Sequence, residues 1–132
     1  MYQQSSTYAD PRAAYMDASV STASPARLLV MLLERLVLDV ERGLESQKTG
    51  DHAQAHAHLV HAQDIVLELR ASLDTDSWEG GPGLASIYDF LHLQLVKANI
   101  RRDPEMTTSC LTLVKDLCAT WREAALAAVE VA

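Results

Sequence analysis

Apolar residues recur every three or four positions along most of the chain, the spacing that places them on one face of an α-helix. Polar or glycine-containing interruptions divide this pattern at residues 49–50, 74–83 and 103. We therefore predict four long helices, over residues 24–47, 51–73, 84–102 and 104–128. No segment alternates apolar and polar residues with the period of a β-strand, so the predicted fold class is all-α.

Residues suited to the first turn of a helix precede three of these segments. Ser24-Pro25 and Asp103-Pro104 each combine a capping side chain with a proline in the first turn, and Asp51 is a further capping residue. Long helices joined by short connections pack antiparallel to their sequence neighbours. We therefore expect an antiparallel, up-down-up-down four-helix bundle.

The chain of 132 residues has the usual length of one domain, so residues 1–132 are predicted to form a single bundle. Residues 1–23 would be an N-terminal arm. Asp10-Pro11 can start a short helix in this arm that ends near Ser19.

Each predicted helix offers one apolar face to the core. The expected core residues are Leu29, Leu32, Leu33, Leu36, Val40 and Leu44 in the first helix, Leu59, Ala62, Ile65, Val66, Leu69 and Leu73 in the second, Leu84, Ile87, Tyr88, Leu91, Leu95 and Ala98 in the third, and Leu111, Val114, Leu117, Cys118, Trp121 and Ala125 in the fourth.

Further apolar residues fall outside these faces. At 100° per residue, the third helix carries an apolar set opposite Leu91, and the first two helices carry smaller sets. These off-core residues are Leu93, Val96 and Ile100, then Val60 and Leu67, then Met31 and Leu38. They indicate either a groove for another protein chain or an apolar stripe covered from within.

The intramolecular explanation is the commoner outcome for such stripes, because side-by-side contact within a bundle buries them. The N-terminal arm carries Tyr15, Met16 and Val20, which could fold back over one of the strips. The two interpretations are compatible, since an arm that covers an apolar groove can be displaced by a partner helix.

Charge and cysteine content narrow the function classes. The formal net charge is −7, which disfavours nucleic acid and anionic membranes as partners. Cys110 and Cys118 would lie about 12 Å apart along one helix, too far for a disulfide, and two free thiols fit a reducing compartment. Neither a signal peptide nor a run of about 20 apolar residues is present, so we predict a cytosolic protein without membrane insertion.

The residues that could carry chemistry form no recognisable site. His52 and His56 share one helix face and His58 and His61 share another, and the two pairs point well apart, so we predict a solvated face rather than a metal site. The glycines at 80–83 are not followed by a lysine or preceded by a strand, unlike a phosphate-binding loop. We therefore predict no catalytic residues, no metal and no cofactor, and a protein that is not an enzyme.

Three motifs in the right order resemble the flagellar secretion chaperones of the FliS family. The first is Tyr15 followed by V-S-T-A-S-P at residues 20–25 and by a helix with Met-Leu at residues 31–32. The second is I-Y-D-F at residues 87–90 with A-N-I at residues 98–100 and an aspartate at 103. The third is Trp-Arg at residues 121–122, followed by two alanines, and the resemblance spans residues 15–125.

The chain departs from the family pattern at three places. Leu33 stands where an aromatic residue is common, and Phe90 replaces a second tyrosine. The loop at residues 74–83 carries Trp78 and extra glycines that have no family counterpart. These departures concern partner contact rather than fold.

The resemblance implies an export chaperone for flagellin. Such a protein would bind the disordered C-terminal segment of flagellin in the cytosol, prevent premature polymerisation and deliver it to the flagellar type III secretion apparatus. From helical phase, the expected partner-binding residues are Val60, Leu67, Leu93, Val96 and Ile100, with Tyr15 and Val20 in a displaceable cover.

Other partners and assemblies stay open at this point. An export-gate component or an anti-sigma factor could be a second partner, and the chain could be a monomer or a weak homodimer. The alternative function is a self-associating helical adaptor without a flagellin client, whose apolar strips would form a dimer interface.

Overall fold

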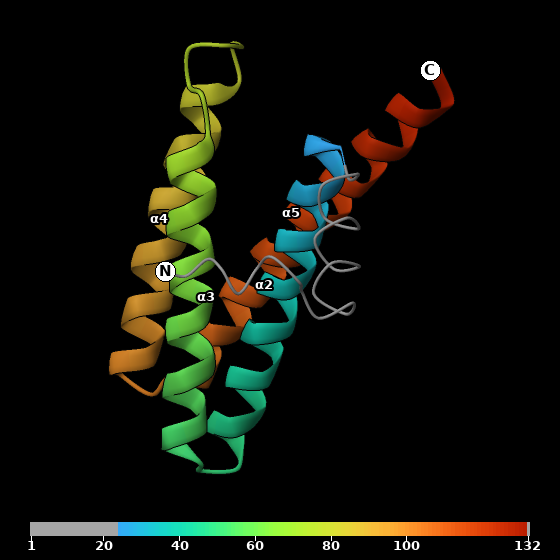
Figure 1. Cartoon of the computed structure of the whole chain (residues 1–132). Helices are drawn as coiled ribbons and strands as arrows, with labels where there is room; N and C mark the ends of the chain where they lie inside the picture. Colours follow the sequence, from blue (N-terminus) through green and yellow to red (C-terminus); the bar gives the residue numbers. More distant parts are fainter. Residues whose placement is uncertain (1–23, 132) are drawn as a thin grey trace, which may run out of the picture.

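The computed structural model describes residues 24–131, which form four α-helices and no strand within that range (Figure 1). The helices are α2 (Pro25–Lys48), α3 (His52–Ser72), α4 (Gly81–Ile100) and α5 (Pro104–Val131). The short helix expected between Asp10 and Ser19, and with it Tyr15 and Val20, lies outside the described residues.

The four helices form an antiparallel bundle in which each helix runs opposite to the next along the chain (Figure 1). Helix α2 packs against α3 and α5, and α4 packs against the same two helices from the other side. Helices α2 and α4 therefore lie diagonally across the bundle. The predicted fold class, an all-α four-helix bundle, is confirmed.

Side-chain caps start three of the helices. Ser24 Oγ accepts a hydrogen bond from the Arg27 amide at 3.1 Å, and Asp51 Oδ1 accepts one from the Gln54 amide at 3.1 Å. Asp103 Oδ1 accepts from two amides of the first turn of α5, at 3.0 and 3.2 Å. Each cap satisfies an amide that has no partner inside its own helix, which fixes where the helix begins.

Helix α4 begins at Gly81, three residues before the start expected at Leu84, and has no side-chain cap. The predicted loop over residues 74–83 is therefore too long, because residues 81–83 form the first helical turn. Pro82 fits there, since the amide that proline lacks would have no helical partner in the first turn. Helix α4 ends at Ile100, two residues before the predicted end, and Arg102 follows with a φ of 50°.

The core lies along the axis of the bundle. Most of the expected core residues are buried, including Leu36, Leu59, Tyr88 and Leu95. Ile87 is an exception, because it is 37 % exposed. It precedes Tyr88 by 100° of helical rotation, and Tyr88 occupies the core side of α4 at that level.

A fully buried carboxylate joins α2 to α3. Asp39 Oδ1 accepts a hydrogen bond from Arg35 Nε at 3.1 Å, and Asp39 Oδ2 is in hydrogen-bond contact with His61 Nδ1 on α3. The expected solvated histidine face is therefore wrong for His61, which is half exposed but bonds to a core carboxylate. A buried carboxylate is tolerated only when its oxygens are paired, as they are here.

We expect His61→Ala to lower the free energy of unfolding by about 1–3 kcal/mol, because it leaves one oxygen of the buried Asp39 without a partner. Urea unfolding followed by circular dichroism measures this change. His52→Ala, the same replacement at an exposed position, is the control and should be nearly neutral. Equal stability of the His61 variant and the wild type would mean that the contact adds nothing to the α2–α3 interface.

Both cysteines are free and buried in α5. Burial raises the pKa of the Cys110 thiol from its ordinary value of 9.0 to about 11. The unfolded chain therefore loses this proton at a lower pH than the folded protein. The contribution of Cys110 to stability is complete below pH 9 and is lost as the pH rises toward 11.

We expect the free energy of unfolding to fall between pH 9 and 11, and to fall less steeply, by about 1–3 kcal/mol over that interval, in the Cys110→Ala variant. Denaturant titrations at several pH values compare the two proteins. All other ionisable groups are common to both proteins, so the difference in slope isolates the thiol. Parallel curves would contradict the assignment.

Candidate functional site

The outer side of α3 and α4 exposes large apolar side chains. Ile100 is 75 % exposed, and Leu67 and Leu93 are each 49 % exposed. Val60 and Val96 are half-buried. We call these five residues the outer face, and they are the described members of the partner-binding set that the sequence predicted.

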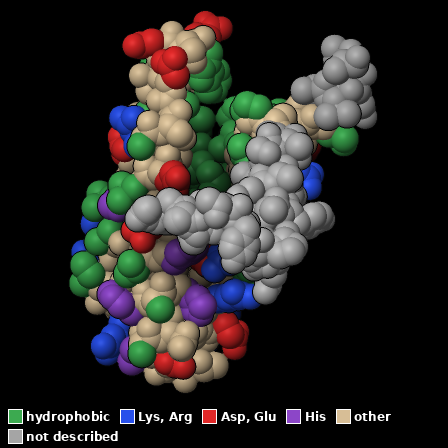
Figure 2. Space-filling view, in the orientation of Figure 1, with side chains coloured by type: hydrophobic (Ala, Val, Ile, Leu, Met, Phe, Trp, Pro, Cys, Tyr) green, Lys and Arg blue, Asp and Glu red, His purple; other side chains and the backbone are tan. Residues whose placement is uncertain are grey.

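Polar contacts between α3 and α4 show how this face is arranged. Arg70 Nε donates to Asp89 Oδ1 at 3.0 Å, and at the other end of the helix pair Asn99 Nδ2 donates to His56 Nδ1 at 2.9 Å. On α3, Val60 and Leu67 lie between these two cross-links and share their side of the helix. Figure 2 shows hydrophobic side chains along the edge formed by α3 and α4.

At one end of the bundle, α2 and α5 diverge from α3 and α4 (Figure 1). A second apolar surface, a cleft, lies at this end. It encloses about 360 Å³. Helix α2 contributes Pro25, Leu28, Leu29 and Leu32, and the opposite side and the floor are formed by Leu69, Ser72, Leu73, Leu84 and Tyr88. Trp78 and Trp121 complete the lining, and we call this surface the end cleft.

The end cleft was not predicted. Leu29, Leu32, Leu73 and Trp121 were expected in the core, but they are only partly buried because the helix pairs separate at this level. Trp78 was noted in sequence only as a departure from a family pattern. A large aromatic residue in a glycine-rich loop is the signal that could have pointed to it.

Trp78 and Trp121 make direct contact at the cleft. Their ring centroids lie 6.4 Å apart and the planes meet at 80°, an edge-to-face arrangement. Trp78 comes from the connection between α3 and α4, whereas Trp121 comes from α5. The two rings therefore connect the α3–α4 half of the bundle to α5 across the cleft.

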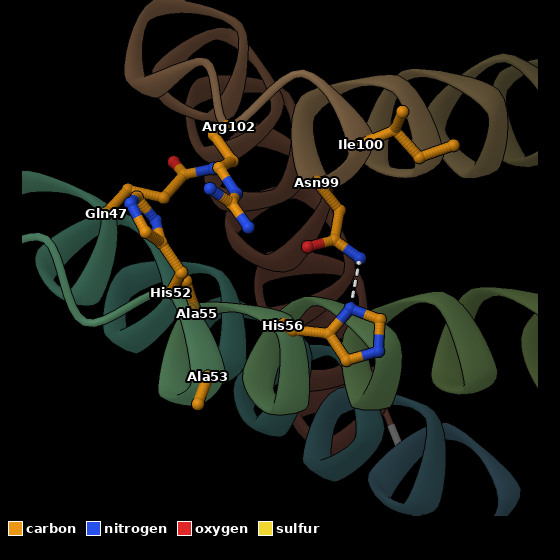
Figure 3. Close-up of a pocket in the computed structure, with 8 residues that line it drawn as sticks. All are labelled: Gln47, His52, Ala53, Ala55, His56, Asn99, Ile100 and Arg102. Carbon is orange, nitrogen blue, oxygen red and sulfur yellow. Dashed lines mark hydrogen bonds between the residues drawn. The ribbon is translucent and has the colours of Figure 1, made fainter.

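A polar pocket of about 530 Å³ lies at the opposite end, between the α2–α3 and α4–α5 turns (Figure 3). His52 and His56 line it from α3, and the Asn99 side chain points toward His56. Buried Gln47 donates from Nε2 to the Ala98 carbonyl at 3.1 Å and so links the two turns. These hydrogen bonds hold the two turns together, which is a structural role.

Titratable groups of the two apolar surfaces offer little chemistry. Burial raises the pKa of the Tyr88 hydroxyl, which keeps it neutral at the cleft floor. Within residues 24–131, no three His, Cys, Asp or Glu side chains are placed to hold a metal ion. No helix within residues 24–131 has the length and hydropathy needed to cross a membrane. The arrangement is suited to binding apolar segments of another protein chain.

Comparisons with known proteins agree on one family. The sequence model described as "Flagellar protein FliS" matches residues 8–128. A flagellar secretion chaperone FliS of Bacillus subtilis is 29 % identical over 115 residues, which cover 87 % of this chain and 86 % of that protein. Its counterpart in Vibrio cholerae is 26 % identical over 107 residues, covering 80 % and 79 % of the two chains.

A solved structure has the same fold. The crystal structure of a flagellar chaperone from bacteria superposes with a TM-score of 0.70 over 86 % of this chain and 94 % of that one, at 20 % sequence identity. The family match spans nearly the whole chain, and the relatives are named as flagellar secretion chaperones, not as enzymes. The chain therefore belongs to the FliS family of flagellar secretion chaperones.

Proposed function

We propose that this protein binds the C-terminal segment of flagellin in the cytosol, prevents its premature polymerisation and delivers it to the flagellar type III secretion apparatus. The observation that supports this client most directly is the outer face. Leu67, Leu93 and Ile100 expose apolar surface on neighbouring helices of a protein that belongs to a family of secretion chaperones. Large apolar side chains exposed together on neighbouring helices are typical of a binding site.

The geometry suits a client without fixed structure. An amphipathic segment can place side chains spaced three or four residues apart between Val60 and Leu67 of α3 and Val96 of α4. The free energy needed to order such a segment reduces the net affinity. A chaperone that must release its client at the export apparatus benefits from this reduction.

The N-terminal arm supplies a cover for the outer face in this proposal. Tyr15 and Val20 would contact the face in the free protein and leave it when the client arrives. The cover would keep exposed apolar surface from aggregating while no client is bound. An export-gate component or an anti-sigma factor remains a candidate second partner.

The same exposed residues would serve the alternative function, a self-associating adaptor. In that case a second copy of the chain would cover Leu93 and Ile100 in a homodimer. The two functions differ in what binds the face, so one titration separates them.

We expect Leu93→Asp to weaken binding of the flagellin C-terminal segment by at least about tenfold, because a charged carboxylate replaces an apolar contact in the complex. Isothermal titration calorimetry with the segment from the same organism measures the affinity, and light scattering gives the mass of the complex. Helicity and melting temperature should stay close to those of the wild type, since Leu93 is exposed.

Met31→Asp is the matched control. Met31 is an exposed apolar residue on α2, diagonally across the bundle from α4, so the same replacement should leave the affinity unchanged. Saturable 1:1 binding with a negative heat-capacity change supports the proposed client. Absence of binding by a wild-type protein that runs as a stable dimer supports the adaptor instead.

A further inference from the structure

Trp78 has no role in the bundle core, although it is the largest side chain of the α3–α4 connection. Its side chain is 45 % exposed, and the buried residues of the core do not include it. A half-exposed tryptophan at the mouth of an apolar cleft resembles the anchor residues of protein interfaces, which are enriched in this residue type. The position of Trp78 therefore indicates a role in binding a partner.

Hydrogen bonds within the loop hold Trp78 over the end cleft. Asp74 Oδ1 accepts from the Asp76 amide at 3.1 Å, and the Asp74 carbonyl accepts from the Ser77 hydroxyl at 3.0 Å. On the far side, the Trp78 carbonyl accepts from the Gly81 amide at 3.1 Å. The segment is thus bonded on both sides of the indole, which reduces the entropy that Trp78 would lose on binding a partner.

Two glycines make room for this arrangement. A Cβ atom on Gly80 would lie 2.1 Å from a ring atom of Trp78, and one on Gly81 would lie 2.7 Å from the Thr75 carbonyl oxygen. Neither position accepts a side chain without moving the indole or the loop backbone. The glycines that distinguish this loop therefore serve the placement of Trp78 against Trp121.

The loop that carries Trp78 at the edge of the cleft is acidic, and we call it the acidic rim. Asp74, Asp76 and Glu79 surround the tryptophan in sequence, and residues 71–83 contain no lysine or arginine. Figure 2 shows acidic side chains gathered at this end of the α3–α4 pair.

The arginines around the cleft do not offset this charge. Arg70 and Arg122 are paired with Asp89 and Glu34, at 3.0 and 2.9 Å. Arg27, on the α2 rim, adds a single further positive charge.

This charge pattern indicates what the cleft receives. An apolar side chain fits the leucine-lined interior, and a lysine or arginine beside it fits the acidic rim. The N-terminal arm is a poor match, because residues 1–23 carry one arginine against two aspartates. A separate protein segment with positive charge next to its apolar anchor is the better match.

We propose that the end cleft receives an apolar anchor side chain of the client, flanked by Lys or Arg, and that Trp78 determines which anchor fits. This inference rests on the proposed function, since it takes the flagellin C-terminal segment as the client. It assigns that segment a second contact, at the end of the bundle and apart from the outer face. Trp78 forms the loop side of the cleft, where the hydrogen bonds on both sides of the indole hold it in place.

The test uses the full-length chain and the flagellin C-terminal segment, with any tryptophan in the segment replaced by phenylalanine. The chain has two tryptophans, Trp78 and Trp121, and both line the cleft, so its fluorescence reports on this site. Binding should shift the emission to shorter wavelength as the indoles leave water. Trp78→Ala should weaken binding at least about tenfold, and Trp78→Phe should retain most of the affinity.

Two further variants make the result specific. Met31→Ala removes an exposed apolar side chain that does not line the cleft and should leave affinity unchanged. The double variant Asp76→Asn with Glu79→Gln should weaken binding about two- to fivefold at low salt and reduce the effect of added salt. These carboxylates are not in the core, so the double variant tests the rim even if Trp78→Ala perturbs the loop.

The outcomes separate this inference from the proposed function. Wild-type affinity in Trp78→Ala, with an unchanged emission wavelength on binding, overturns the assignment of the cleft and leaves the flagellin client in place. Failure of the wild-type protein to bind the segment contradicts the proposed function and the inference with it. Weakened binding in Trp78→Ala with recovery in Trp78→Phe supports both.

Discussion

The hydrogen bond from Gln47 to the Ala98 carbonyl fixes the narrow end of the bundle. It joins the end of α2 to the end of α4, next to the two tight turns that contain Gly50 and Arg102, both with positive φ. With these turns held together, the two helix pairs are free to separate only at the other end. The end cleft lies at that other end, where α2 and α5 diverge from the α3–α4 pair (Figure 1).

The helices carry more apolar surface than the core uses. Part of the excess lines the end cleft, and part lies on the outer face, where Leu93 and Ile100 point away from the bundle axis. Two apolar surfaces on different sides of one small protein suit a long client segment better than a single short helix. Contact spread in this way can be strong in total while each part is weak enough to be released in turn.

Features set by residues near in sequence were predictable. The caps at Ser24, Asp51 and Asp103 and the helical phase of the outer-face residues depend on a few adjacent positions. The end cleft was missed because it depends on the angle between helix pairs, which no local pattern encodes. Burial of Asp39 was also missed, since a carboxylate on the apolar side of a helix is accepted only when partners such as His61 arrive from another helix.

The contact between Gly80 and the ring of Trp78 couples two positions in the divergence of this family. While the tryptophan is present, a side chain at position 80 collides with its ring, so a substitution there displaces the indole. Once a smaller residue replaces the tryptophan, a side chain at position 80 no longer collides with a ring, and the glycine can be substituted. Among relatives, we therefore expect glycine at position 80 mainly where an aromatic residue stands two positions earlier.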